Sequence, residues 1–160
     1  MKKLYPIILL LLIGLIACQS DQPEPVVFPT IDTTIETYPT PDSVTLATGE
    51  QVYQRHCAEC HGTGLQGETN WPNPNPDGTM SAPPHSVLGY TWTRSDQEIY
   101  QIIMNGGSEI AEALGGEGRM PAFDDVLTDA EVWAVMAYIK ESWPDDLRQM
   151  QWQITQRANQ

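Results

Sequence analysis

Five consecutive residues, Cys57-Ala58-Glu59-Cys60-His61, constrain this chain more than any other feature. Two thiols three positions apart lie on one side of a helical turn, where both can form thioethers with the vinyl groups of one haem. The adjacent imidazole then reaches the iron. The spacing predicts one covalently bound haem c, with Cys57 and Cys60 as the attachment residues and His61 as an axial ligand.

Three other interpretations use the same cysteines: a structural disulfide, a thioredoxin-like redox pair and a zinc site. A redox pair is expected in a βαβ context, and the sequence has no such pattern. Zinc would need a fourth ligand such as His56 or His85, and His56 is poorly placed to share a metal with His61. Covalent haem is therefore the preferred interpretation.

The first residues predict export. Two lysines precede an apolar run, and the segment from Leu4 to Ala17 has 14 residues, fewer than the roughly 20 of a transmembrane helix. Leu15-Ile16-Ala17-Cys18 resembles a bacterial lipobox, which predicts a signal peptide over 1–17 and a lipidated Cys18. The alternative is that Cys18 merely ends the apolar run without a lipid, but it would then be an unpaired thiol in an exported protein. We therefore expect an extracytoplasmic lipoprotein held on a membrane, on the periplasmic side or at the cell surface.

The rest of the chain divides into three parts. Residues 18–45 are rich in Pro, Thr and Asp and predict a flexible tether after the lipidated cysteine. Residues 46–145 carry the helical signals and the cysteine motif, and they are expected to form the domain. Residues 146–160 are expected to be a C-terminal tail, which could form a short amphipathic helix.

The charge of the chain favours protein partners of opposite sign. Without Lys2 and Lys3 of the signal peptide, six basic residues remain against 21 acidic ones, a net charge of −15. Such a surface repels nucleic acid and anionic lipid. We expect redox protein partners with a basic docking patch, and no binding to nucleic acid.

Two capping boxes predict helix starts, at Ser95-Asp96-Gln97-Glu98 and at Thr128-Asp129-Ala130-Glu131. The first precedes isoleucines at core spacing, and the second precedes a nearly all-apolar run with Pro144 after its end. An earlier helix is expected to begin around Leu46. No alternating strand pattern is present, so the predicted fold class is all-α, with much loop wrapped around the haem.

The sixth iron ligand must come from elsewhere in the chain, and Met120 is the best candidate. It lies in a Gly-rich loop, stiffened by Pro121, just before the last apolar helix. A thioether stabilises ferrous iron and raises the reduction potential relative to a second imidazole. The remaining candidates are His85, Met104 and Met80.

Taken together, "CAECHG", "APPH", "MPAF" and "LTDAEVWAVMAYIKESWP" resemble a class I, monohaem bacterial cytochrome c over residues 46–145. The resemblance implies a small helical fold whose N-terminal and C-terminal helices cross near the haem attachment site, and it implies electron transfer. It assigns Cys57 and Cys60 to the thioethers, and His61 and Met120 to the iron. It also implies that the Pro83 carbonyl accepts the His61 Nδ1 hydrogen.

Several residues lie outside the simplest form of this pattern. His85 stands where a small apolar residue often packs on haem, which leaves a bis-histidine alternative open, whereas His56 is expected at the surface. Tyr90, Trp92 and Arg94 could reach the haem propionates, although core packing without haem contact is an equal alternative for each. Trp133 and Tyr138 are expected to be core residues packed on the first helix.

Two functions of different classes are compatible with a single haem. The preferred one is a membrane-tethered carrier that passes single electrons between respiratory or photosynthetic partners, or a fixed electron-transfer subunit of a larger oxidoreductase. Neither needs a substrate pocket or a catalytic residue. The alternative is a haem enzyme or a ligand-binding sensor, which needs an open position on the iron opposite His61.

Overall fold

Helix α1 (Ser43–His56) begins earlier than the sequence indicated, because Asp42 caps it. The Asp42 carboxylate accepts hydrogen bonds from the backbone N–H groups of Val44 and Thr45, both at 2.9 Å. These bonds satisfy two of the donors that a helix start leaves free. The N-cap therefore fixes the helix three residues before Leu46, where the prediction placed its beginning.

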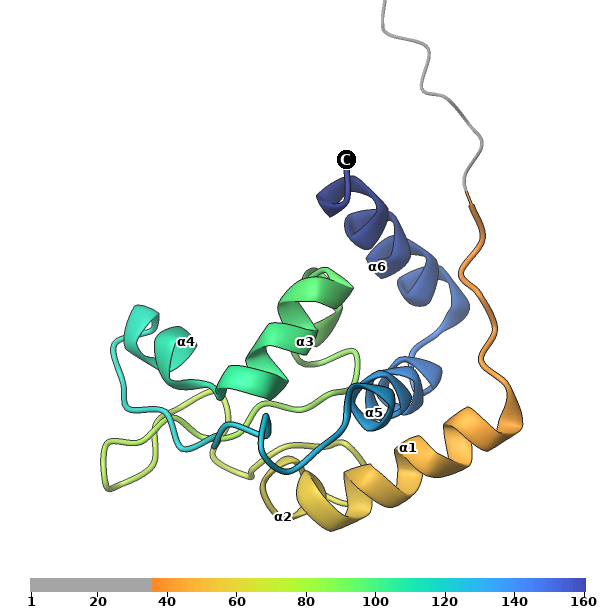
Figure 1. Ribbon diagram of the computed structural model, residues 1–160. Coiled ribbons are helices and arrows are strands. Elements are labelled where there is room, and N and C mark those ends of the chain that lie inside the picture. The colour runs from red at the N-terminus through yellow and green to blue at the C-terminus, as the bar shows by residue number, and fades with distance from the viewer. Residues whose placement is uncertain (1–35) are drawn as a thin grey trace, which may run out of the picture. The chain divides into compact units, whose positions relative to one another are not determined.

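The computed structural model describes residues 36–160 (Figure 1). These residues form helices joined by long loops, and their only bridge is an isolated one between Thr79 and Glu117. The all-α fold class is confirmed. After α1 the elements are α2 (Ala58–His61), η1 (Thr91–Thr93), α3 (Asp96–Asn105), α4 (Ser108–Ala113), α5 (Asp129–Glu141) and α6 (Asp145–Ala158).

Both predicted capping boxes are confirmed. The Ser95 hydroxyl accepts from the Glu98 backbone N–H while the Glu98 carboxylate accepts from the Ser95 N–H, and α3 starts there. Thr128 and Glu131 form the same reciprocal pair at the start of α5. Local hydrogen bonds therefore determine where both helices start.

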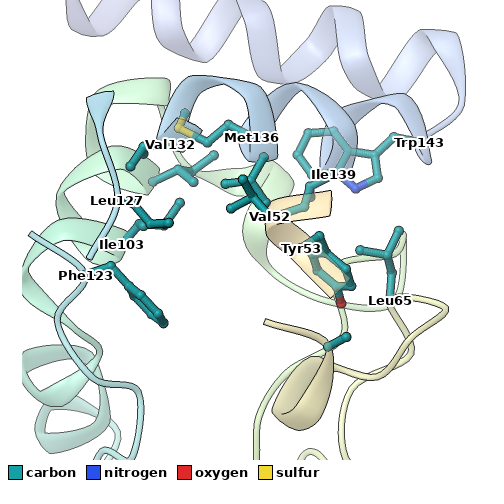
Figure 2. Packing of buried hydrophobic residues seen from close by; sticks show 13 residues of the cluster. Val52, Tyr53, Leu65, Ile103, Phe123, Leu127, Val132, Met136, Ile139 and Trp143 are labelled. Atoms are coloured by element: carbon teal, nitrogen blue, oxygen red, sulfur yellow. The ribbon is translucent and has the colours of Figure 1, made fainter. Parts of the chain in front are cut away.

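Helix α5 lies at the centre of the fold, against α1 on one side and α3 on the other (Figure 1). The family resemblance implied that the N-terminal and C-terminal helices cross near the haem attachment site. Here α1 packs against α5, and a further helix, α6, follows α5. Figure 2 shows the core in two groups, with Phe123 and Ile103 on one side and Tyr53 and Trp143 on the other. Helix α5 contributes to both groups, since Val132 lies beside Leu127 in the first and Ile139 lies beside Trp143 in the second (Figure 2).

Two aromatic residues of α5 differ in their packing. Tyr138 packs against Tyr53 of α1 with ring centroids 5.4 Å apart, as expected. Trp133 was expected in the core against α1, and this expectation is wrong: its side chain is 45% exposed and stacks on Tyr100 of α3. The run from Val132 to Ile139 is apolar on every side of the helix, so the sequence does not indicate which of these residues face outward.

Residues 146–158 of the expected tail belong to α6, so the helix that the sequence allowed there is present, and it packs against α3 and η1. The Thr155 hydroxyl accepts the Asp96 backbone N–H at 2.9 Å, and the buried Gln151 amide donates to the Arg94 carbonyl. Within residues 36–160 no helix combines the length and the apolar character that a membrane crossing requires. The predicted signal peptide and Cys18 lie outside the described residues.

The end of the predicted tether contacts α6. The Gln149 side chain forms two hydrogen bonds with the backbone of this segment: it accepts from the Tyr38 N–H and donates to the Glu36 carbonyl, each at 3.0 Å. The Tyr38 ring meets the Trp152 ring edge to face, with centroids 6.2 Å apart. The last residues before α1 therefore follow the surface of the domain.

Candidate haem attachment site

The attachment motif stands where α1 gives way to α2. Cys57 is the residue between the two helices, and its carbonyl accepts the backbone N–H of His61 at 2.9 Å. The Tyr53 hydroxyl donates to the Gly62 carbonyl at 2.8 Å and ties the end of α2 back onto α1. This bond fixes the turn that carries both cysteines and the histidine.

The two thiols are free and differ in exposure. Cys57 is partly buried against the hydrophobic core, whereas Cys60 is exposed. Burial, together with the neighbouring Cys60, raises the pKa of the Cys57 thiol to about 11. Both groups are therefore available for thioether formation rather than joined in a disulfide.

The His61 imidazole is 8% exposed, and its Nδ1 lies 2.8 Å from the Pro83 carbonyl oxygen. Because a carbonyl can only accept, Nδ1 carries the hydrogen and Nε2 presents a lone pair. Burial lowers the pKa of His61 and favours the neutral ring. A neutral imidazole with one nitrogen anchored is the form that binds a metal.

The loop of residues 62–85 brings Pro83 to His61. Gly67 has a φ of +73°, and a Cβ there would lie 2.5 Å from the Pro84 nitrogen. Its N–H donates to the His61 carbonyl at 2.7 Å. A side chain at Gly67 would therefore push Pro83 and Pro84 away from the histidine.

Sequence reasoning missed Glu68, which links this loop to the loop carrying Met120. Its carboxylate accepts the Ala82 backbone N–H at 2.8 Å and pairs with the Arg119 guanidinium. Burial alone would raise the pKa of Glu68, but the hydrogen bonds from Ala82 and Asn75 and the Arg119 charge lower it. No local motif marks a residue whose partners are 14 and 51 positions away.

Met120 is partly buried and packs against the hydrophobic core. Its carbonyl accepts the Gly107 N–H at 3.0 Å, which holds the methionine loop against the end of α3. Of the other candidates, Met104 also packs on the core, while Met80 binds the Glu117 carbonyl through its backbone N–H. The role of Met120 as an iron ligand stays a prediction.

The three residues proposed near the haem propionates have different surroundings. Tyr90 is 57% exposed, and its ring lies 5.6 Å from that of Trp71. Trp92 packs on the core, and its Nε1 is buried without a hydrogen-bond partner among the described residues. The Arg94 backbone carbonyl binds Gln151 of α6.

The residues present fit a covalently bound haem. The buried N–H of Trp92 lacks an acceptor, which a haem carboxylate could supply. The free thiols of Cys57 and Cys60 and the available Nε2 of His61 are the donors that a haem c requires. On an all-α fold, this donor set defines a small c-type cytochrome.

Comparison with known proteins agrees with this class. The family model of the cbb3-type cytochrome c oxidase subunit III matches residues 44–139, so the chain belongs to this family. A cbb3-type cytochrome c oxidase subunit FixP of Sinorhizobium medicae is 34% identical over 97 residues, and one of Rhizobium meliloti is 33% identical over the same length. The corresponding subunit of Azorhizobium caulinodans is 31% identical over 106 residues.

The similarity covers a part of each protein. It spans 59% of this chain and 29% of the Sinorhizobium and Rhizobium subunits, and 66% of this chain and 32% of the Azorhizobium subunit. No solved structure gave a significant match. The chain is a c-type cytochrome that acts in electron transfer and binds haem c covalently.

Proposed function

We propose that this chain is an exported, lipid-anchored electron carrier or electron-transfer subunit, without a catalytic centre of its own. The observation that carries the proposal is the motif at the junction of α1 and α2, with His61 held by the Pro83 carbonyl at 2.8 Å. When bound, the haem supplies a one-electron couple at its iron. The described residues hold and orient that group rather than bind a substrate.

We assign the thioethers to Cys57 and Cys60 and the axial positions to His61 and Met120. A thioether opposite an imidazole raises the potential, which suits a carrier near the oxidising end of a chain. The bis-histidine alternative is disfavoured, because the His85 ring stacks on the His61 ring with centroids 4.1 Å apart. Because its ring lies beside that of His61, His85 would not be placed to bind the iron from the side opposite His61.

The proposed partners follow from the relatives and from the charge. The relatives are named as subunits of a cbb3-type cytochrome c oxidase, which supports an oxidase complex as the source or destination of the electron. The net charge of −15 that remains without the signal peptide supports a basic docking patch on that partner. We further propose that the Cys18 lipid holds the protein on the outer face of a membrane, with the following residues as its tether.

The test is the optical spectrum of the haem-loaded protein with and without carbon monoxide. Met120→Leu should abolish the near-infrared band of methionine-bound ferric haem and open the iron to carbon monoxide, whereas the wild type should not bind it. Met104→Leu is the matched control, because Met104 also packs on the core. Rapid carbon monoxide binding by the wild type would favour the haem enzyme or sensor instead.

A further inference from the structure

A second imidazole lies flat against the proposed iron ligand. The His85 and His61 ring planes differ by only 25° at a centroid separation of 4.1 Å. The loop of residues 62–85 begins just after His61 and ends at His85, so the path of this loop brings the two rings together.

Three hydrogen bonds hold His85 in place. Its Nδ1 lies 2.8 Å from the Thr91 hydroxyl, and its backbone N–H donates to the Leu65 carbonyl at 2.9 Å. Its own carbonyl accepts the Trp143 indole N–H at 2.6 Å. Leu65 and Trp143 are buried, so the His85 ring is attached to the rigid part of the fold.

The His61 ring is therefore constrained in two ways: Pro83 binds its Nδ1, and His85 packs against its face. The bond from Nδ1 to the Pro83 carbonyl fixes one atom of the ring but leaves the plane free to tilt about that bond. A flat neighbour at stacking distance removes this freedom. The partners of a metal-binding histidine set its ring orientation and its basicity.

We propose that His85 is a positioning residue that holds the plane of the His61 imidazole and thereby sets the reduction potential of the haem. This inference rests on the proposed role of His61 as an iron ligand. Without the flat contact, the His61 ring samples several orientations and its hydrogen bond to Pro83 weakens. A more weakly hydrogen-bonded imidazole donates less to ferric iron, so the potential rises.

The experiment compares His85→Leu with His85→Phe in the haem-loaded protein. The phenyl ring keeps a flat face against His61, whereas the leucine does not. His85→Leu should broaden the low-spin electron paramagnetic resonance signal of the ferric protein and raise its midpoint potential, and His85→Phe should stay close to the wild type. Unchanged values in His85→Leu, or an equal change in both variants, would overturn the proposal.

A second variant keeps the test decisive where His85→Leu yields no haem-loaded protein. Thr91→Val removes the hydroxyl that is hydrogen-bonded to the His85 side chain and leaves both rings in place. It should shift the signal and the potential in the same direction by a smaller amount, and no shift would contradict the proposal. A wild-type spectrum without histidine ligation would instead overturn the proposed function, which separates the two failures.

Discussion

Gly49 of α1 lies directly against the backbone of Ala134 in α5. A Cβ at position 49 would come within 2.0 Å of the Ala134 carbonyl oxygen and 2.9 Å of the Tyr138 Cβ. Glycine in the middle of a helix costs about 1 kcal/mol relative to alanine, so propensity alone disfavours it. The close approach of the two helices explains its presence, and it lets Tyr53 and Tyr138 meet on the same face.

Gly49→Ala should therefore destabilise the protein although alanine is the better helix former. Overpacking of this kind costs about 1–3 kcal/mol, because the two backbones must move apart. Chemical denaturation of the haem-loaded protein measures the effect. Glu50→Ala, at the next and exposed position of α1, should stay within about 0.5 kcal/mol of the wild type. Equal stability of Gly49→Ala and the wild type would show that the helices do not meet at this residue.

The unpaired indole of Trp92 predicts a contact with the haem. If its Nε1–H donates to a haem carboxylate, Trp92→Phe removes a hydrogen bond to a charged group, worth about 1.5–3 kcal/mol. Trp152→Phe is the matched control, because its Nε1 is also buried and unpartnered among residues 36–160 but its ring packs on Tyr38. Denaturation and potentiometry of both variants should show a change in potential for Trp92→Phe alone. Similar potentials in both would contradict the assignment.

The ion pair of Lys140 and Asp96 predicts asymmetric effects of single and double substitutions. Their side chains are 5% and 15% exposed, and Gln151 also donates to the same carboxylate oxygen. Lys140→Met should cost about 3–5 kcal/mol, because it leaves a buried carboxylate without its counter-ion. The double variant Lys140→Met/Asp96→Leu should recover part of that loss in chemical denaturation. If the double variant has the same free energy of unfolding as Lys140→Met, the prediction is wrong and the ion pair itself stabilises the fold.

Glu68 predicts a dependence on acid. Its folded pKa is lowered, so the stability that it contributes is present above its unfolded pKa of 4.5 and is lost as the pH falls through the lower folded value. Glu68→Gln should therefore flatten the acid limb of the stability curve. The acid limb is measured by lowering the pH and monitoring the absorption band of methionine-bound haem. Glu50→Gln, which changes an exposed carboxylate, is the control. An unchanged acid limb in Glu68→Gln would contradict the link between the two loops.

Local signals in the sequence predicted the parts of the fold that local chemistry determines. The capping boxes at Ser95 and Thr128 correctly predicted the starts of α3 and α5. The spacing of Cys57, Cys60 and His61 predicts the haem attachment site. The start of α1 at Asp42 was missed, although Asp is a favoured N-cap residue.

Features that depend on distant contacts could not be predicted. Trp133 lies in the apolar run of α5, where composition does not distinguish the buried face from the exposed one. The packing of α6 depends on hydrogen bonds that join Thr155 and Gln151 to residues more than 50 positions away. The stack of His85 on His61 likewise arises from the path of a loop without regular structure.

The covalent haem is the central claim, and mass spectrometry of protein matured in a host that attaches haem c tests it most directly. The intact mass should include one haem, and the proteolytic peptide that contains Cys57 and Cys60 should carry it through both sulfurs. Cys57→Ser and Cys60→Ser should each leave a single thioether. Colourless protein with both thiols free after such maturation would contradict the account.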